Sequence, residues 1–293
     1  MNVDDLVAVD VHVHAEASAD GHRALPDRLM SGSAAYFKTD GDRAPSIDRI
    51  ADYYRQRRMA AVVFTVDAET ATGHPPVRSE EVAEACAAHA DVLIPFGSVD
   101  PWQGAAAVGR ARALAREYGV RGIKFHPSLQ AFHPNDPMVY PLYGALQELG
   151  MIALFHSGQT GIGAGLPGGA GLRLKYANPM ALDDVAVDFP DLRIVIAHPS
   201  FPWQEEALAV ATHKPNVHID LSGWSPKYFP SVLIRYANTL LRDKVLFGSD
   251  FPLLTPDRWL HDFDALDIKP EVRPLILKEN AVRLLGLREA QGA

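Results

Sequence analysis

The segment LVAVDVHVH, at residues 6–14, is the best starting point for reading this chain. Its β-branched, apolar character predicts a strand, and side chains of a strand point alternately to opposite faces. Asp10, His12 and His14 then share one face, and the valines between them share the other. Two imidazoles are thus directed to one place. Taken alone, such a pair fits a metal site and a pair of packed core histidines equally well.

Seven more β-rich runs follow along the chain. They lie at residues 61–67, 92–99, 121–126, 151–156, 193–198, 217–222 and 245–250. Most of them are separated by segments with helical spacing of apolar residues, at 80–90, 105–118, 140–149, 202–211 and 232–241. Alternating strands and helices imply parallel strands joined by helical crossovers. Eight repeats in about 250 residues predict an α/β fold, the closed (β/α)₈ TIM barrel.

An open, doubly wound sheet is the alternative architecture. Dinucleotide-binding folds of that kind carry a glycine-rich turn after the first strand. Here the first strand runs into His14-Ala15-Glu16-Ala17, which contains no such turn. The barrel is therefore the preferred prediction.

Length and composition favour one large domain. The chain has 293 residues, 47% of them hydrophobic, and no stretch suited to link two domains, so residues 1–293 are predicted to form a single domain. A net charge of −8 without a basic stripe argues against a nucleic-acid partner and against an anionic membrane surface. No apolar run approaches the roughly 20 residues that cross a bilayer, which argues against a membrane protein.

The cellular location follows from two further features. The first residues lack the basic start and the long apolar segment of a secretory signal. The single cysteine, Cys86, can form no disulfide within the chain. A cytoplasmic location is expected.

Residues 15–46 form a long, polar and irregular connection after the first strand. In a barrel, such a connection lies over the active face, where long loops commonly carry function. We expect this segment to be a flexible loop that acts as a lid.

Ionisable side chains gather at the carboxyl ends of the predicted strands. They are His12 and His14 on the first strand, Lys124 and His126 on the fourth, His156 on the fifth, His198 on the sixth, Asp220 on the seventh and Asp250 on the eighth. Strand alternation predicts, for example, that Ile194, Ile196 and His198 share a face. Barrel enzymes build their active sites at this end of the strands, so the joint pattern favours an active site.

Six motifs, in this order, resemble the amidohydrolase superfamily, and within it the branch that includes aminocarboxymuconate-semialdehyde decarboxylase. They are DVHVH (10–14), GIKFHP (122–127), FHSG (155–158), AHP (197–199), FGSDFP (247–252) and ENAVRLL (279–285). The resemblance covers nearly the whole chain and implies one divalent metal ion, usually zinc and sometimes manganese. It implies His12, His14, His156 and Asp250 as ligands, with His198 beside the metal as a catalytic histidine.

The chemistry of these side chains suits that role. Neutral imidazoles with one carboxylate are typical zinc ligands, and a catalytic site keeps one position open for water. A bound ion of this kind lowers the pKa of that water to about 7. We expect Asp250 to accept or return the proton, and protonated His198 to stabilise an oxyanion or a leaving group.

Lys124 and His126 are candidates for binding a small, anionic substrate. Lys124 is expected to be a free ammonium that binds a substrate anion or carbonyl. One alternative is a lysine paired with a carboxylate such as Asp67 or Asp220. Another, taken from binuclear members of the superfamily, is a carbamylated lysine that bridges two metal ions.

Three more candidates lie in loops. The loop at 158–176 contains seven glycines, followed within it by Arg173 and Lys175. An arginine there offers a bidentate grip on a carboxylate or phosphate, and a surface loop with solvated charges is an equal alternative. Trp224 is a candidate for stacking on a planar substrate, with a core or subunit-interface tryptophan as the alternative.

Three functions are compatible with these features. The first is a hydrolase, in which metal-activated water attacks a carbonyl to cleave an ester, amide or C–C bond. By resemblance, hydrolysis of aryl β-ketoacyl-CoA thioesters in aromatic catabolism is a special case. The second is non-oxidative decarboxylation of an aromatic or unsaturated acid by a carboxy-lyase. The third, a binding protein without catalysis, is disfavoured because every ligand position is filled. Since relatives are often dimers, a homodimer is expected.

Overall fold

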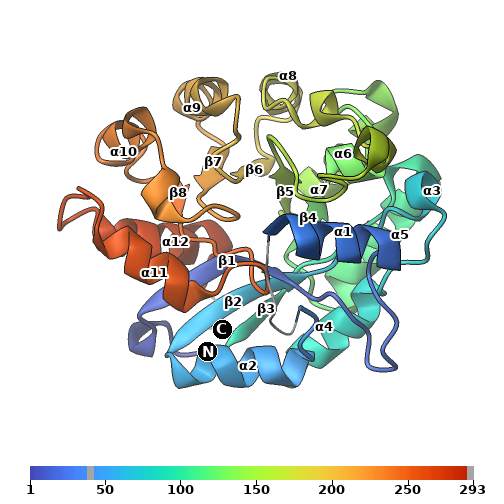
Figure 1. The fold of residues 1–293 in the computed structure, drawn as a ribbon, viewed down its shortest axis with the longest axis horizontal. Coiled ribbons are helices and arrows are strands. Elements are labelled where there is room, and N and C mark those ends of the chain that lie inside the picture. The colour runs from blue at the N-terminus through green and yellow to red at the C-terminus, as the bar shows by residue number, and fades with distance from the viewer. Residues whose placement is uncertain (38–42, 289–293) are drawn as a thin grey trace.

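The computed structural model describes residues 1–37 and 43–288, and eight parallel strands lie in this part of the chain. They are β1 (Ala8–His14), β2 (Met59–Phe64), β3 (Leu93–Pro95), β4 (Gly122–Phe125), β5 (Ile152–His156), β6 (Arg193–Ala197), β7 (Val217–Asp220) and β8 (Val245–Leu246). Each overlaps one of the predicted runs. Figure 1 shows the strands at the centre of the molecule with helices arranged around them.

Two hydrogen-bonded sheets join to close the barrel. One has the strand order β1-β2-β3 and the other the order β4-β5-β6-β7-β8, and all neighbouring strands are parallel. The sheets meet at two seams, where Gly97 bridges to Ile123 and Val13 bridges to Phe251. Because both seams are paired, the strands form a closed cylinder. The predicted (β/α)₈ TIM barrel is confirmed.

Helices cover the outside of this cylinder (Figure 1). The five predicted helices are present as α4 (Ser79–Ala87), α5 (Ala105–Glu117), α7 (Tyr140–Glu148), α9 (Gln204–His213) and α10 (Ser231–Ala237). Further helices are α2 (Ile47–Gln56), α3 (Glu69–Thr72), α6 (Pro127–Gln130), α8 (Ala181–Asp188), α11 (Pro256–Asp264) and α12 (Asn280–Leu285). Within the described residues, no helix has the length and apolar character needed to span a membrane.

Two of the helices that the prediction missed carry clear start signals. The Ser46 side chain accepts a hydrogen bond from the amide of Arg49 at the start of α2. The Thr255 side chain does the same at the start of α11, where Pro256 occupies the first helical position. Serine and threonine are common cap residues, and proline at the first helical position of α11 is a further start signal, so these two helices were readable from the sequence.

The connection at 15–46 was expected to be irregular throughout, but part of it is helical. Residues Asp27–Phe37 form helix α1. The helix is anchored by Leu29, which is buried in a small apolar cluster with Leu129. Residues 38–42 of this connection, on which part of the lid prediction falls, lie outside the described residues.

The alternation predicted for β1 is wrong. Val9 and Val11 pack in the apolar cluster inside the barrel, whereas Val13 packs in the cluster shared with the helices. The register of β1 against β2 shifts between Asp10 and Val13, and such an irregularity reverses the faces that follow it. Asp10 therefore contacts helix α2 and does not share the face of the two histidines that follow it.

The alternation predicted for β6 is also wrong. Ile194 and Ile196 pack in the outer cluster with the helices, and Val195 and Ala197 pack inside the barrel. His198 follows the strand with a φ of +71°, in the left-handed region. This conformation, and not strand alternation, brings the His198 side chain to the central cavity.

Candidate functional site

A cavity of about 640 Å³ opens at the carboxyl ends of the barrel strands. Barrel enzymes place their active sites there, and the volume suits a small-molecule ligand. Seven of the predicted site residues line it, namely His14, Lys124, His126, His156, His198, Trp224 and Asp250. His12 is fully buried and forms hydrogen bonds or ion pairs with three of these seven side chains, and its ring also lies beside that of His198.

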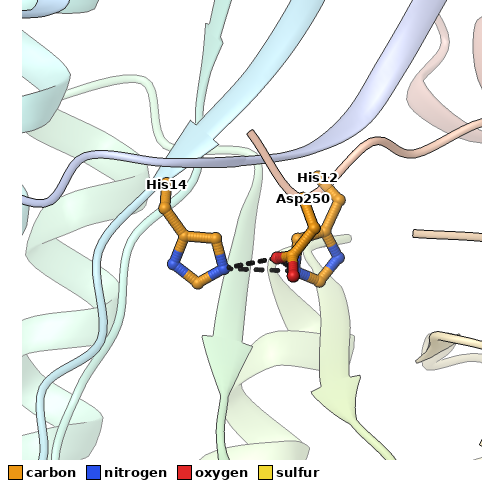
Figure 2. Close-up of side chains that lie close together, drawn as sticks. All are labelled: His12, His14 and Asp250. Carbon is orange, nitrogen blue, oxygen red and sulfur yellow. Dashed lines mark hydrogen bonds and ion pairs between the residues drawn. The ribbon is translucent and has the colours of Figure 1, made fainter. Parts of the chain in front are cut away.

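Figure 2 shows His12, His14 and Asp250 directed toward one another. Nε2 of His14 lies 3.1 Å from Oδ1 of Asp250, and Nε2 of His12 lies 3.3 Å from the same oxygen. The two Nε2 atoms are 3.3 Å apart. Burial alone would raise the pKa of Asp250, but the contacts with His12 and His14 hold it well below its usual range. Three ligand atoms of the kind that bind divalent metals therefore meet at one point.

Hydrogen-bond partners determine which ring nitrogen of His12 carries the proton. Oδ2 of Asp220 lies 2.9 Å from Nδ1 of His12, and a carboxylate can only accept. The ammonium of Lys124 lies 3.1 Å from Nε2 of His12, and an ammonium can only donate. A neutral His12 ring therefore carries its proton on Nδ1 and a lone pair on Nε2. His14 has a similar carboxylate partner, since Oε1 of Glu16 lies 3.4 Å from its Nδ1.

His198 and His156 form a chain of hydrogen bonds with a defined direction. Nδ1 of His198 lies 3.0 Å from the carbonyl oxygen of Ser222, which only accepts, so this nitrogen carries a proton. Burial lowers the pKa of His198 to about 4, so its ring is neutral and Nε2 accepts. Nδ1 of His156, at 3.0 Å, therefore donates to it. Nε2 of His156 is left with a lone pair, buried and without a hydrogen-bond partner among residues 1–37 and 43–288.

His156 thus offers a nitrogen suited to a metal, although it is not part of the compact group formed by His12, His14 and Asp250. A buried imidazole nitrogen without a partner is costly unless something binds there. The donor set fits a divalent metal ion. The complete ligand set of four residues remains a prediction.

Lys124 is buried at the end of β4, and its ammonium lies 5.0 Å from the centre of the Phe64 ring. Burial lowers the pKa of Lys124 to about 8. The pairing with Asp67 considered above does not occur, because that carboxylate bonds to Arg110 at 2.8 Å. Asp220 acts on Lys124 only through its charge. Lys124 is therefore available to a ligand in the cavity.

His126 presents a hydrogen-bond donor to the same cavity. Its Nδ1 accepts from the backbone amide of Leu129, so the proton lies on Nε2, which is 3.4 Å from Oγ1 of Thr160. The ring stacks on that of His156, with centroids 3.9 Å apart and planes 8° apart. Burial lowers the pKa of His126 well below its usual range, so the ring is neutral.

The loop candidates separate into two groups. Trp224 lines the cavity, and its ring lies 5.6 Å from that of Phe201. Arg173 and Lys175 are exposed and do not line the cavity, so the structure does not bring them to the site. The beginning of the glycine-rich loop lines the cavity, and the chain then carries Arg173 and Lys175 to the surface.

Sequence reasoning missed Glu16 and Arg43, and it placed Asp220 at the end of the seventh strand without recognising it as the partner of His12. Asp220 and Glu16 are the carboxylate partners of the two histidines on β1. Arg43 lines the cavity, and its Nη1 is buried with no hydrogen-bond partner in the part of the chain that is described. Asp220 was visible as a polar strand end. Arg43 carried no signal, because the path of the 15–46 connection cannot be read from its composition.

Gly223 is a backbone constraint on the site. It has a φ of +75°, and a Cβ atom at this position would lie 2.6 Å from Nδ1 of His198 and 3.3 Å from Oδ2 of Asp250. A side chain there must displace the His198 ring.

We predict that Gly223→Ala lowers catalytic turnover by about 100-fold or more, since displacements of about 1 Å have effects of that size. The matched control is Gly165→Ala, because Gly165 also has a positive φ, of +78°, but has open space around its Cβ position. Both variants carry backbone strain, so melting temperatures should fall in both. Steady-state kinetics should show the loss of turnover in Gly223→Ala alone; equal turnover in the two variants would contradict the prediction.

Comparison with known proteins agrees with this geometry. The Amidohydrolase family profile matches residues 9–287. Among curated proteins, none matches the sequence significantly. An uncharacterised TIM-barrel protein from Bordetella bronchiseptica is 23% identical with a TM-score of 0.77, over 95% of this chain and 98% of that chain.

Two similar structures belong to enzymes with named activities. The 5-carboxyvanillate decarboxylase of Novosphingobium aromaticivorans, solved with bound manganese, is 16% identical with a TM-score of 0.69, over 96% of this chain and 97% of the other. A probable 2-pyrone-4,6-dicarboxylic acid hydrolase from Acinetobacter baumannii is 15% identical with a TM-score of 0.62, over 96% of this chain and 100% of that chain. At these identities the likeness establishes a shared fold. Because the family profile spans nearly the whole chain, this protein is an enzyme of the Amidohydrolase family.

Proposed function

We propose that this enzyme is a metal-dependent hydrolase that binds one divalent ion through His12, His14, His156 and Asp250. The observation that carries the proposal is the convergence of the His12 and His14 Nε2 atoms on the Asp250 carboxylate, at 3.1 to 3.3 Å. When both rings are neutral with their protons on Nδ1, the two Nε2 lone pairs and the carboxylate face one another, and a cation between them satisfies all three. When bound, such an ion lowers the pKa of water to about 7 and polarises a carbonyl.

Zinc and manganese both suit this set of nitrogen and oxygen ligands. Zinc is the expected ion from the resemblance, and the similar decarboxylase contains manganese. We therefore propose zinc as the bound ion, with manganese as the alternative.

The residues of the chain have distinct tasks in this proposal. Asp250 accepts a proton from water, because its carboxylate lies in the cavity beside both ligand histidines of β1. His198, which also lines the cavity, is neutral before the reaction, so it first takes up a proton at Nε2 and then, as the charged ring, donates that proton to the group that leaves. The chain of bonds from the Ser222 carbonyl through His198 holds the His156 ring in place.

The cavity suits a planar, anionic substrate. Lys124, His126 and Arg43 supply hydrogen-bond donors on its wall, which can hold a carboxylate or a carbonyl oxygen. Trp224 and Leu254 supply apolar surface for a planar ring. The decarboxylase and the hydrolase described above both act, by their names, on compounds that carry carboxylates.

Decarboxylation of an aromatic or unsaturated acid is the second candidate. The likeness to a manganese-containing decarboxylase favours it. Lys124 and Arg43, the cationic side chains on the cavity wall described above, would hold the carboxylate that is lost. Hydrolysis of an aryl β-ketoacyl-CoA thioester is one form of the first candidate. A cytoplasmic location and a homodimeric state stay predictions.

Isotope labelling distinguishes the two reactions. We predict that, with β-ketoacyl thioesters and aromatic carboxylates as trial substrates, water labelled with heavy oxygen places that oxygen in the product, because hydrolysis adds water to a carbonyl. Mass spectrometry measures the label. Release of carbon dioxide, with deuterium from heavy water bound to the product carbon, would establish decarboxylation and contradict hydrolysis.

Metal stoichiometry tests the site itself. Protein purified without chelator should contain about one zinc or manganese ion per chain by elemental analysis, as expected for a mononuclear catalytic site. His14→Gln should lose that ion. The control, His133→Gln, should retain it, because the His133 ring packs on Tyr176 away from the cavity.

Two other outcomes of this measurement would contradict the mononuclear site. Two ions per chain would identify Lys124 as a carbamylated bridge. No bound ion, even after reconstitution, would overturn metal dependence.

The proton on His12 gives a further test. Oδ1 of Asp220 accepts from the backbone amides of Ser222 and His198, at 2.9 and 3.4 Å. In Asp220→Asn, the amide oxygen should therefore occupy that position and the NH₂ group should face His12. The His12 proton must then move to Nε2, which removes the metal-binding lone pair.

We predict that Asp220→Asn weakens metal affinity by about 10- to 100-fold, the usual effect of changing a hydrogen-bond partner of a ligand. Titration against a competing chelator measures it. Asp67→Asn is the matched control, since Asp67 is also buried but bonds to Arg110. Unchanged affinity in Asp220→Asn would contradict the proposed orientation of His12.

A further inference from the structure

The Ser222 hydroxyl, fully buried just after β7, contacts two functional histidines at once. Its Oγ lies 3.0 Å from Nδ1 of His12 and 2.9 Å from Nδ1 of His198. It also makes a short hydrogen bond to Oδ1 of Asp220. One hydroxyl thus touches a candidate metal ligand, a candidate catalytic residue and the carboxylate that supports them.

The hydrogen-bonding capacity of each group determines the direction of these bonds. An ionised carboxylate only accepts, so the Ser222 hydroxyl donates its one proton to Asp220. The Ser222 oxygen keeps two lone pairs, which can accept one N–H from each histidine. The hydrogen-bonding capacity of the hydroxyl is then fully used, with one bond donated and two accepted.

Each histidine also has a second acceptor at the same nitrogen. Nδ1 of His12 lies 2.9 Å from Oδ2 of Asp220, and Nδ1 of His198 lies 3.0 Å from the Ser222 carbonyl oxygen. Both second acceptors require a proton on Nδ1. Two independent sets of contacts therefore point to the same tautomer in both rings.

We propose that Ser222 is a positioning residue that holds His12 and His198 as Nδ1–H tautomers at a fixed spacing, with the Nε2 lone pair of each ring on the side away from the hydroxyl. The ring centroids lie 4.9 Å apart, and the hydroxyl is bonded to the Nδ1 side of both. His12 needs an Nε2 lone pair to bind a metal, and His198 needs one to accept a proton. The role of Ser222 rests on the proposed metal-dependent function.

A second metal site is the competing interpretation of this cluster. The ligand atoms of His12, His198 and Asp220 lie within 4.8 Å of one another, as they would around an ion. The Ser222 hydroxyl bonds to all three side chains. Protonated ring nitrogens cannot bind a metal, so this group is a hydrogen-bonded cluster and leaves one metal site on the other side of His12.

Nuclear magnetic resonance of the metal-free wild-type protein tests the tautomers directly. Long-range correlations between ring protons and ring nitrogens identify which nitrogen carries the proton, and His12→Gln and His198→Gln variants assign the signals. We expect Nδ1–H in both rings. A proton on Nε2 alone in either neutral ring would overturn the proposal, and this measurement depends neither on bound metal nor on a Ser222 variant that folds.

Removal of the hydroxyl tests its effect on the metal site. Ser222→Ala should weaken zinc binding about 10-fold or more, measured by competition with a chelator. Ser200→Ala is the matched control, because Ser200 is also fully buried and, within residues 1–37 and 43–288, its hydroxyl donates a hydrogen bond to the His198 backbone carbonyl, at 3.4 Å, and to no histidine ring. The control should bind zinc like the wild type.

The outcomes separate this inference from the proposed function. Equal zinc affinity in the two serine variants would overturn the role of Ser222 while leaving metal dependence intact. Absence of zinc or manganese binding in the wild type would overturn the proposed function, and the ring tautomers would still decide whether Ser222 orients the two histidines.

Discussion

The contact between the first and last strands of the barrel brings the two ends of the chain together. Behind the site, the Asp10 carboxylate accepts from the amide and the hydroxyl of Ser249, at 2.9 and 2.5 Å, and from the Tyr54 hydroxyl at 2.6 Å. The amide of Asp250 donates to the carbonyl of His12 at 2.9 Å. Burial raises the pKa of Asp10 to about 6, which shows how completely this carboxylate is removed from water. Without this seam, His12 and Asp250 would not meet, and the site would not exist.

Groups that can only accept hydrogen bonds organise the chemistry of the site. The carboxylates of Asp220 and Glu16 face the Nδ1 atoms of the two histidines on β1, and the carbonyl of Ser222 faces Nδ1 of His198. Each such partner directs a lone pair to the opposite side of its ring. The lone pairs consequently accumulate on the cavity side. This arrangement stabilises a bound cation and destabilises the site when nothing neutralises it, which is a common cost of preorganised active sites.

Backbone conformation adds a second cost at the same place. His198 and Asp250 both have left-handed φ angles, of +71° and +73°, although neither is a glycine. Such conformations cost on the order of 1 kcal/mol each and persist only where the surrounding structure holds them. Here the flanking strands of a closed barrel hold them. The conformations turn both side chains to the cavity, so strain in the backbone supplies geometry that regular strands do not.

The sequence by itself determined the eight strands, their parallel order and the inward faces of Lys124 and His156, because alternation is a local property that a regular strand preserves. It also marked Asp250 as a carboxylate after the last strand, although a left-handed backbone is what turns this side chain to the cavity. Only the tertiary structure decided how β1 turns at its irregular register, how His198 reaches the cavity, and which carboxylate supports each histidine. It also placed Arg43 at the site and left Arg173 on the surface. These features arise from contacts between segments far apart in the chain, and no local pattern of residues encodes such contacts.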